Sequence, residues 1–399
     1  MRLEVADLAT LGFDLPLMGF SDQELAALST SQPAAGLTDP DAIPEAPVRP
    51  VTRPGDVWIM DRHRIICGDA RDAGDVARLL DGCAINVAFT SPPYAEQREY
   101  DHASGFEPIP PDRYVEWFKP VAANVAHHLA PDGSWFVNIK PSVDGLDTSL
   151  YVFDLVIAHV REWGWHFATE FCWERVGVPK SVTQRFKNQF EPIYQFARGR
   201  WKMRPDAVRH ESENVPRAAG PGVGQTSWRD VHGNGGNAGS ISFGPVKKRR
   251  NGFPSQEGFQ GTDWQKGAPL GVPLEHIGPG LAYPGNRLPT FTTSHQALGH
   301  AAAFPVGLPD FFCKAYADPG DVIYDPFCGT GSTIIAAQQT GCVGVGCDLS
   351  PIYVDVTVKR WQAFTGHQAV RADGRTFNEL EEDHARTKAA SDTPALAAG

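Results

Sequence analysis

The sequence contains no run of apolar residues that approaches the roughly 20 needed to cross a bilayer. Its start, Met1-Arg2-Leu3-Glu4, lacks the basic and apolar stretches of a secretion signal. The seven cysteines include no Cys-x-x-Cys pair, and most of them lie in apolar segments. This distribution is typical of buried, reduced thiols, so neither a zinc site nor a disulfide framework is indicated. These absences predict a cytoplasmic protein with no membrane segment and no bound metal.

Positive charge is also scarce, because 36 Lys and Arg residues are outnumbered by 47 Asp and Glu residues, which gives a formal net charge of −11. The charge is unevenly distributed, however. Residues 1–50 carry eight acids against two bases, whereas residues 175–209 carry nine bases against two acids. A polyanion can therefore bind the second region although the whole chain is acidic. The alternative interpretation of this region is a solvated basic face.

Apolar strands alternate with amphipathic helices in two parts of the chain, residues 55–200 and residues 293–370. This order predicts a doubly wound α/β fold with a mostly parallel sheet. In the first part we expect a hairpin over 56–67, strands over 84–90, 134–139, 167–173 and 192–197, and helices over 76–80, 112–129 and 150–163. In the second part we expect strands over 322–325 and 343–348, and helices over 305–315, 332–340 and 351–364.

The remaining segments lack this periodicity. Residues 1–30 contain the pattern of one short helix, and residues 31–54 hold six prolines, which predicts a stiff linker rather than a packed element. Gly, Asn, Ser and Pro dominate residues 201–292, which predicts a large loop-rich insertion. Residues 371–399 are polar and alanine-rich, and we expect them to form a flexible tail.

A loop with two glycines, Asp325-Pro326-Phe327-Cys328-Gly329-Thr330-Gly331-Ser332, lies between a predicted strand and a predicted helix. The glycines allow a tight turn and a close approach of the backbone to a ligand at the N-terminus of the helix. About twenty residues further on, the next predicted strand ends at Asp348, where a carboxylate can accept hydrogen bonds from two ribose hydroxyls. No Lys-Ser/Thr follows the glycines, which excludes a P-loop for nucleotide triphosphates.

The acid at the start of this loop narrows the choice of ligand. A carboxylate at Asp325 repels a pyrophosphate but suits the ammonium group of an amino acid. The ligand that combines a ribose with a cationic amino acid is S-adenosylmethionine, which is therefore the predicted cofactor. NAD is the competing ligand that the residue types leave open.

A second motif, Ser91-Pro92-Pro93-Tyr94, follows the predicted strand over 84–90. Two prolines fix the backbone, so the Ser91 hydroxyl and the Pro92 carbonyl can both accept a hydrogen bond from an amino group, and Tyr94 offers a flat face for stacking of a base. Acceptors of this kind favour a tetrahedral nitrogen that attacks a sulfonium methyl directly, without a covalent intermediate. The alternative interpretation is a proline-rich turn after a core strand.

Together the two motifs resemble those of the N4-cytosine/N6-adenine DNA methyltransferase family, and the resemblance covers roughly residues 55–370. The catalytic motif precedes the cofactor motif, with a long variable segment between them. This order resembles the β class of the family and implies a circularly permuted, Rossmann-like methyltransferase fold. It further implies methylation of an exocyclic amino group on a base that is flipped out of double-stranded DNA.

The resemblance also assigns roles to individual residues. The catalytic tetrapeptide is Ser91, Pro92, Pro93 and Tyr94. Cofactor contacts are implied for Asp69, Phe304, Pro305, Asp325, Phe327, Gly329, Gly331, Ser332 and Asp348. DNA contacts are implied for Lys187, Phe190, Lys247, Lys248, Arg249 and Arg250, with Phe190 beside the flipped base, the basic cluster on phosphates and residues 201–292 as the target-recognition region. Residues 1–30 resemble the tail of a ParB-like domain that is often fused upstream in phage and mobile-element members.

The identity of the target base depends on Ser91 alone. Serine at the head of the tetrapeptide resembles the cytosine-N4 branch, whereas aspartate is more typical of adenine-N6 enzymes in this class, so we expect cytosine N4 with adenine N6 as the alternative. Methylation of a protein glutamine is less favoured because of the motif order and the basic insertion. A non-catalytic DNA-binding remnant is less favoured because both motifs are intact. The sequence leaves open a cognate restriction endonuclease as a partner, and also the oligomeric state.

Overall fold

The computed structural model describes residues 36–95, 106–144, 147–175, 186, 188–211, 281–291 and 304–391. The chain divides into two compact units, Met1–Val208 with Pro284–Gly399, and Arg209–Tyr283. The described part of the second unit contains a short antiparallel ladder of β9 (His210–Glu211) and β10 (Leu281–Ala282). All elements discussed below belong to the first unit.

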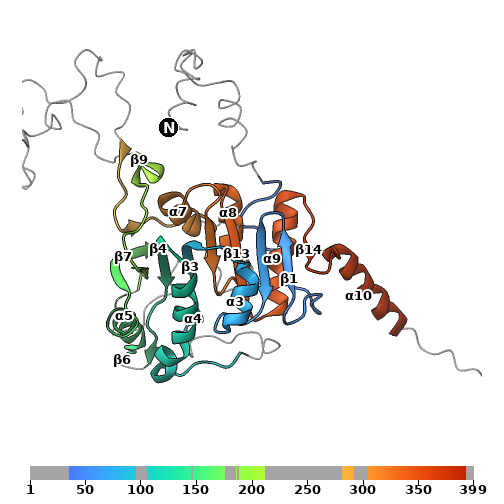
Figure 1. Cartoon of the computed structure of the whole chain (residues 1–399), viewed down its shortest axis with the longest axis horizontal. Helices are drawn as coiled ribbons and strands as arrows, with labels where there is room; N and C mark the ends of the chain where they lie inside the picture. The colour runs from blue at the N-terminus through green and yellow to red at the C-terminus, as the bar shows by residue number, and fades with distance from the viewer. Residues whose placement is uncertain are drawn as a thin grey trace, which may run out of the picture. The chain divides into compact units, whose positions relative to one another are not determined.

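A ten-stranded sheet runs through the first unit in the order β11-β7-β8-β4-β3-β12-β13-β2-β1-β14 (Figure 1). The five central strands, from β4 to β2, are parallel to one another, whereas β1 and β8 run antiparallel to both of their neighbours. The strands are β1 (Val57–Met60), β2 (His63–Cys67), β3 (Ile85–Thr90), β4 (Leu129–Asn138), β7 (His166–Glu174), β8 (Phe190–Ala197), β11 (Arg287–Leu288), β12 (Val322–Asp325), β13 (Val343–Asp348) and β14 (Val370–Arg371).

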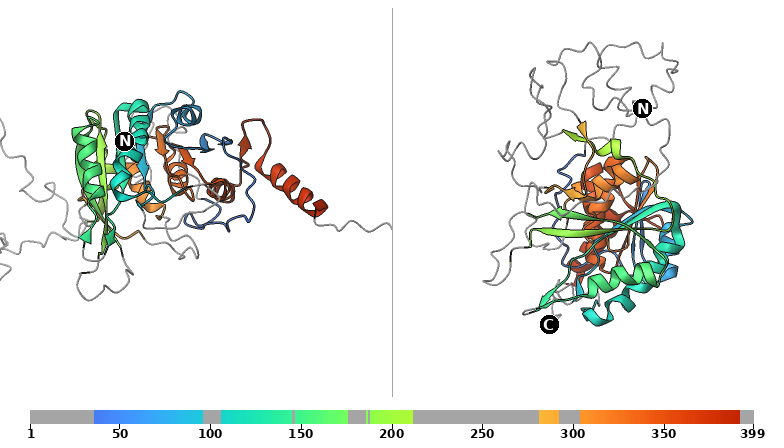
Figure 2. Two further views of the ribbon diagram at one scale, coloured as in Figure 1. Left: turned by 90° about the horizontal axis from the view of Figure 1, so that it is seen from below. Right: turned by 90° about the vertical axis from the view of Figure 1, so that its left-hand side faces the viewer.

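Helices cover both faces of this sheet (Figure 2). One apolar cluster joins the strands to α3 (Ala73–Leu80), α4 (Tyr114–His128) and α5 (Tyr151–Arg161). The other cluster joins them to α7 (Gly307–Tyr316), α8 (Ser332–Thr340) and α9 (Pro351–Thr365). Two 3₁₀ turns, η4 (Pro111–Arg113) and η5 (Pro205–Val208), and a small hairpin of β5 (Val143–Asp144) and β6 (Asp147–Thr148) complete the connections.

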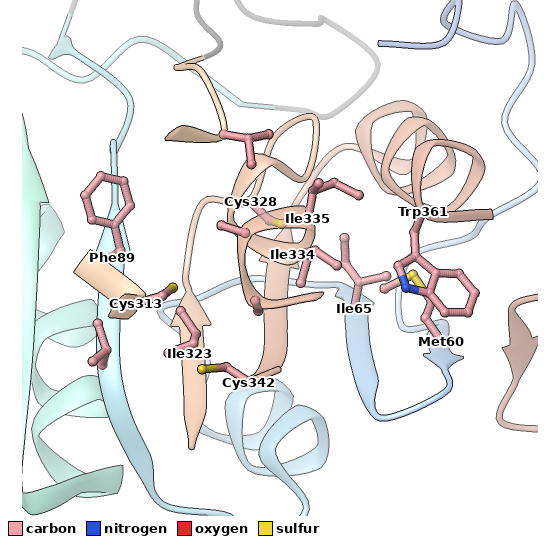
Figure 3. Packing of buried hydrophobic residues seen from close by; sticks show 14 of the residues in the cluster. Met60, Ile65, Phe89, Cys313, Ile323, Cys328, Ile334, Ile335, Cys342 and Trp361 are labelled. Atoms are coloured by element: carbon pink, nitrogen blue, oxygen red, sulfur yellow. The ribbon is translucent and has the colours of Figure 1, made fainter. Parts of the chain in front are cut away.

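Successive side chains along the central strands face opposite sides of the sheet, so each strand contributes residues to both apolar clusters. Ile65 of β2 belongs to the cluster under α7, α8 and α9, whereas its neighbour Ile66 belongs to the other. Figure 3 shows Ile65 and Ile323 of β12 on the face that also carries Ile334 of α8 and Trp361 of α9. Strands that are buried on both faces read as continuous apolar runs, which explains why the sequence indicated them so clearly. The predicted doubly wound α/β fold is confirmed, and the circular permutation stays a prediction.

The proline-rich segment differs from its prediction as a stiff, unpacked linker. The buried carboxylate of Asp355 on α9 accepts hydrogen bonds from the backbone N–H groups of Val51 (2.6 Å) and Thr52 (3.0 Å). Further back, the N–H of Leu37 donates to the carbonyl of Phe364 at 2.8 Å. Residues 36–54 are therefore attached to α9 by acceptors that lie about 300 residues away in the sequence, which composition cannot show.

The predicted tail and the predicted insertion also need correction at their boundaries. The tail contains α10 (Phe377–Ser391), in which Phe377 is fully buried and its ring lies 5.1 Å from that of Trp58. The insertion was placed at 201–292, but Arg204 donates from its N–H to the carbonyl of Ala315 and β11 pairs with β7 in the main sheet. The separate unit therefore spans only Arg209–Tyr283.

Two further findings concern the absences noted in the sequence. All seven cysteines are free, and five of them are buried. Within the described ranges, no helix is long and apolar enough to cross a membrane.

Replacing Asp355 by alanine tests the attachment of residues 36–54. The change leaves two buried N–H groups without their acceptor, and we expect the free energy of unfolding to fall by about 2–3 kcal/mol. Urea unfolding followed by circular dichroism measures this. The control is Asp132→Ala, which removes an exposed carboxylate and should shift stability by no more than about 0.5 kcal/mol. Equal stabilities of the two variants would show that the segment contributes nothing to the fold.

Candidate active site

The carboxyl ends of the five parallel strands meet at one edge of the sheet, and both motifs lie at this edge. From β12 the chain passes through α8 to β13 on one side, and from β3 it passes through α4 to β4 on the other side. Ligands of doubly wound sheets bind where the direction of winding reverses in this way. Tyr324 of β12 pairs with Ala88 of β3, so the two strands end at nearly the same level. The cofactor loop and the catalytic tetrapeptide thus leave the sheet side by side.

The cofactor loop makes its turn at two glycines. Gly329 and Gly331 have φ angles of 54° and 80°, and a Cβ at Gly331 would lie 2.6 Å from the methyl carbon of Thr357. Asp348, at the end of β13, accepts hydrogen bonds from the N–H groups of Gly329 and Ser350, both at 2.8 Å. The Thr357 hydroxyl donates to the carbonyl of Gly329 at 2.9 Å. The loop is therefore shaped by the residue that was predicted to bind the ribose.

Arg360 of α9 supports the same loop from inside the protein. Its guanidinium donates to the carbonyl of Thr330 at 2.9 Å and to the carbonyl of Pro40 at 2.6 Å. Burial lowers the pKa of this guanidinium to about 10. The sequence analysis missed Arg360, and the available signal was its spacing of three residues from Thr357 along the helix.

Phe304 and Pro305, which were predicted to lie around the methionine part of the cofactor, do adjoin the loop. The Ser332 hydroxyl donates to the carbonyl of Phe304 at 2.8 Å. The Phe304 ring packs edge-on against Phe89 of β3, with 5.3 Å between the ring centroids, and Pro305 is buried. The structure therefore brings this segment to the boundary between β3 and the loop.

Asp325 is more deeply buried than its predicted contact with an ammonium group requires. Its carboxylate accepts hydrogen bonds from the Thr333 hydroxyl (2.6 Å) and the N–H of Phe327 (3.1 Å), and its exposed fraction is 0%. Burial raises the pKa of this carboxyl from its ordinary value of 3.8 to about 6. The contacts in this structure fold the loop, and they direct the ring of Phe327 against Trp117 at 5.8 Å.

A cavity of about 600 Å³ is lined by Arg71 and Leu349, which lie close to Asp69 and Asp348 in the chain. Its lining includes Leu349, which directly follows Asp348, and Arg71, whose guanidinium binds both carboxylate oxygens of Asp69 at 2.7–3.0 Å. Trp117 of α4 lies on the same cavity, 5.8 Å below Arg71. The volume is within the roughly 300–1,000 Å³ of small-molecule sites. Its lining combines apolar side chains such as Phe106, Trp117 and Leu349 with charged ones such as Arg71 and Glu107, which is compatible with the adenine and ribose of S-adenosylmethionine. Within the described ranges, no three His, Cys, Asp or Glu side chains are placed to hold a metal ion.

In the Ser-Pro-Pro-Tyr tetrapeptide, Pro92 and Tyr94 are buried, whereas Ser91 and Pro93 are half-buried. The Tyr114 hydroxyl of α4 donates to the carbonyl of Pro93 at 2.7 Å, which fixes the tetrapeptide. The Ser91 hydroxyl donates to the Tyr94 hydroxyl at 3.3 Å. Tyr94 is only 4% exposed, so its ring is not presented as the stacking face that the sequence predicted. Instead its hydroxyl is used as a hydrogen-bonding group.

Glu191 of β8 is the main site residue that the sequence analysis missed. Its carboxylate lies 3.3 Å from the Tyr94 hydroxyl, 3.0 Å from the Lys140 ammonium and 3.8 Å from the guanidinium of Arg175. Glu191 is 6% exposed. The signals in the sequence were its place in Asn188-Gln189-Phe190-Glu191, which resembles a motif of the family, and an acid at the start of an apolar strand, but neither assigned it a role.

The residues predicted to contact DNA are only partly described. Phe190, the first residue of β8, is 44% exposed and is the neighbour of Glu191 in the chain. The other predicted contacts lie outside the described residues: Lys187, Lys247, Lys248, Arg249 and Arg250.

Part of the basic region over 175–209 is neutralised within the chain, which limits the interpretation of this region as a surface for a polyanion. Lys202 forms ion pairs with Asp318 (2.9 Å) and Asp321 (2.7 Å), and Arg204 lies 2.7 Å from Asp318. The hydrogen bonds to these two acids raise the pKa of Lys202 above its ordinary value, against the opposing effect of burial.

Comparison with protein families gives two matches along the chain. A family model described as DNA methylase, of the N6/N4 type, matches residues 85–359. A second model, described as a ParB-methyltransferase HTH domain, matches residues 1–54, which is longer than the 30 residues that the sequence analysis assigned to a ParB-like tail.

Individual relatives cover different parts of the chain. The type II methyltransferase M.PvuII of Proteus hauseri is 22% identical over 300 residues, which are 72% of this chain and 82% of the relative. M.MwoI of Methanothermobacter wolfeii is 30% identical over 145 residues, 35% of this chain and 21% of the relative. Among solved structures, PvuII DNA methyltransferase (cytosine-N4-specific) has a TM-score of 0.48 at 19% identity, covering 79% of this chain and 90% of that one. An M1.HpyAVI–SAM complex has a TM-score of 0.41 at 13% identity, covering 72% and 95%.

Replacing Asp348 by alanine should weaken the binding of S-adenosylmethionine by about 10- to 100-fold. The change removes the carboxylate that holds Gly329 and that we expect to accept a hydrogen bond from the ribose, and one charge-assisted hydrogen bond contributes about 1.5–3 kcal/mol. Isothermal titration of the cofactor measures the affinity, with Asp132→Ala as the exposed control. An unchanged affinity in a folded Asp348→Ala protein would refute the ribose role.

Asp325 should give the stability of the cofactor-free protein a specific pH dependence. Because the pKa of Asp325 is raised to about 6 in the folded state, its contribution is fully present below pH 3.8 and declines as the pH rises to about 6. At roughly 1.4 kcal/mol per pKa unit the loss amounts to about 3 kcal/mol. We expect Asp325→Asn to remove this slope in unfolding experiments between pH 4 and 7. Parallel stability curves of the two proteins would contradict the assignment.

Proposed function

The chain belongs to the N6/N4 DNA methylase family, whose model matches residues 85–359, and we propose that it methylates cytosine N4 in double-stranded DNA with S-adenosylmethionine as the methyl donor. The observation that carries this proposal is the position of Ser91. It follows β3 at the point where the winding of the sheet reverses, beside the glycine loop that follows β12. An acceptor for an amino group is therefore adjacent to the loop that matches the family's cofactor motif.

The residues of the chain divide between holding the cofactor and orienting the amine. The loop at Gly329 and Gly331 and the carboxylate of Asp348 would hold the donor, and the cavity beside Leu349 would receive its adenine. When bound, S-adenosylmethionine supplies a methyl group on a positively charged sulfur. The Ser91 hydroxyl and the Pro92 carbonyl accept hydrogen bonds from the N–H groups of the target amine. This draws the nitrogen lone pair out of conjugation and directs it at the methyl carbon.

The choice of cytosine over adenine depends on the side chain at position 91. A serine hydroxyl is neutral and resembles the cytosine-N4 branch of the family, whereas aspartate at this position is more typical of adenine-N6 enzymes. Adenine N6 is the second candidate, because both groups can accept a hydrogen bond from an exocyclic amine. A flipped-out base is required in either case, since a stacked base cannot bring its amino nitrogen to Ser91.

Recognition of DNA is assigned to two features. The exposed ring of Phe190 starts the strand that also carries Glu191, and we infer that it flanks the flipped base. The unit Arg209–Tyr283 has the loop-rich, partly basic composition of a target-recognition region, and its cluster over 247–250 is proposed to contact phosphates. Affinity for DNA of any sequence should therefore fall steeply with salt concentration.

The direct test is incubation of the protein with unmethylated DNA and labelled S-adenosylmethionine, followed by mass spectrometry of the nucleosides. We expect N4-methylcytosine. Detection of N6-methyladenine instead would transfer the proposal to adenine, and the absence of both products would overturn it.

Ser91→Ala should lower the rate of methyl transfer by about 100-fold while the affinity for S-adenosylmethionine changes less than about twofold. The reason is that only the acceptor aimed at the amine is lost, an effect of the size seen for other single groups that act in a transition state. Ser149→Ala, in the loop before α5, is the matched control and should keep the wild-type rate. Full activity of Ser91→Ala would remove Ser91 from the mechanism.

A further inference from the structure

A chain of hydrogen-bonding groups leads from the tetrapeptide into the protein. The Ser91 hydroxyl donates to the Tyr94 hydroxyl at 3.3 Å, and the Tyr94 hydroxyl lies 3.3 Å from Oε2 of Glu191. Oδ1 of Asn138 lies 3.4 Å from the same hydroxyl. A tyrosine hydroxyl has one proton to donate, and a carboxylate is a stronger acceptor than an amide. The continuous path is therefore Ser91, Tyr94 and Glu191.

The end of this path is a carboxylate that solvent barely reaches. Glu191 is 6% exposed, and its other oxygen, Oε1, faces the ammonium of Lys140 at 3.0 Å and the guanidinium of Arg175 at 3.8 Å. A buried carboxylate is costly unless cations and hydrogen bonds compensate it, and here both cations bind Oε1. Oε2 is consequently directed at Tyr94.

Asn138 has a different function in this group. Its amide nitrogen donates to the carbonyl of Pro192, the residue after Glu191, at 3.1 Å. In addition, the N–H of Ile139 donates to the same carbonyl at 3.3 Å. These two bonds fix the start of β8 against the end of β4, and they set the position of Glu191. An amide cannot take up a proton at neutral pH, so Asn138 positions the path and does not end it.

Methylation of an amine produces a proton that must leave the site. The nitrogen lone pair forms the new N–C bond, and the electron pair of the C–S bond stays with sulfur. The nitrogen then carries a positive charge until one of its N–H protons departs. At the tetrapeptide, the Ser91 hydroxyl is a poor base by itself but is hydrogen-bonded to a group that can take its proton.

We propose that Glu191 accepts, through Tyr94 and Ser91, the proton that the target amine releases. The amine proton passes to Oγ of Ser91, the Ser91 proton passes to the Tyr94 hydroxyl, and the Tyr94 proton passes to Oε2 of Glu191. Serine and tyrosine end the step in the form in which they began it, and Glu191 becomes a neutral acid beside Lys140. Glu191 acts through other residues, so it is a positioning and relay residue rather than a group in contact with the substrate.

The inference rests on the proposed function, and it further predicts that the rate of methyl transfer depends on Glu191. Glu191→Gln keeps the size of the side chain and an oxygen acceptor for Tyr94, but it removes the group that takes up the proton. We expect single-turnover methyl transfer to fall about 100-fold, within the range for general bases. The dissociation constants for S-adenosylmethionine and for DNA should each change less than about twofold. Glu170→Gln, which alters an exposed carboxylate on the neighbouring strand β7, is the control and should keep the wild-type rate.

Tyr94→Phe breaks the same path at its middle and keeps the ring. If protons travel along one path, the variant that carries both Glu191→Gln and Tyr94→Phe should be at most about twofold slower than either single variant. Independent effects would instead multiply, to about 10,000-fold. Multiplication of the two losses would overturn the relay.

A structural role of Glu191 predicts a different result. Glu191→Gln removes the carboxylate charge that faces the Lys140 ammonium, and any loss of stability from this should be relieved in the variant that also carries Lys140→Met. We expect this double variant to unfold near the wild-type midpoint and to remain about 100-fold slow. Recovery of the rate together with stability would show that Glu191 only supports the fold. If the wild-type chain methylates no DNA, the proposed function fails; if it is active and Glu191→Gln equals it, only the relay fails.

Discussion

Asp348 joins three loops at the carboxyl edge of the sheet, and the geometry of the site depends on this residue. Its side chain accepts from the N–H groups of Gly329 and Ser350, and its backbone carbonyl accepts from the N–H of Gly68 at 2.9 Å. The loops after β12, β13 and β2 are therefore held by one residue. A carboxylate has lone pairs for about four hydrogen bonds, so these contacts are compatible with further bonds to a ribose. We propose that fixing the loop and binding the ribose are two uses of the same charge.

Polar groups buried behind the site explain why the loops can be rigid although they contain glycine and proline. Arg360 supports the carbonyl of Thr330 from inside, and Asp355 holds the backbone at Val51. Each of these charges would be costly if it were unsatisfied, and each is instead bonded to backbone groups of a loop that has no ladder of its own. Helix α9, which carries both residues, thus supports the cofactor loop and the segment over 36–54 at once.

The elements that could be predicted from the sequence were those with a local signal. The ranges 322–325, 332–340 and 343–348 match β12, α8 and β13 to the residue, because short apolar strands and a helix are bounded there by Gly, Pro and Asp. The two-residue strands β11 and β14 are too short to show a period of two, and they form because β7 and β1 offer free edges. In α10 the apolar pair Phe377 and Leu380 was the only sign of burial in a polar segment.

Within the site, the predictable residues were those in contiguous motifs, and the others depend on distant parts of the chain. Tyr94 and Glu191 are 97 residues apart in sequence, and Val51 and Asp355 are 304 apart. Neither pair has a spacing that indicates contact, since only the order of strands β3, β4 and β8 brings Glu191 to the tetrapeptide. The motif predicted Tyr94 as a stacking face, because an aromatic ring beside a base is the local interpretation. Its hydroxyl acquires another role only through the long-range partner.

Two buried carboxylates near the reversal of the winding differ in what they are bonded to, and this difference separates their tasks. Asp325 is bonded to a threonine hydroxyl and a backbone N–H, and burial raises its pKa to about 6. Glu191 is bonded to Lys140 and to a tyrosine hydroxyl. The first arrangement uses its hydrogen bonds to shape the cofactor loop. The second connects a carboxylate to Ser91 through a single hydroxyl. In the proposed relay, a proton released at Ser91 therefore passes through Tyr94 to Glu191 at the start of β8, and the acid of the cofactor motif need not change its protonation state during the reaction.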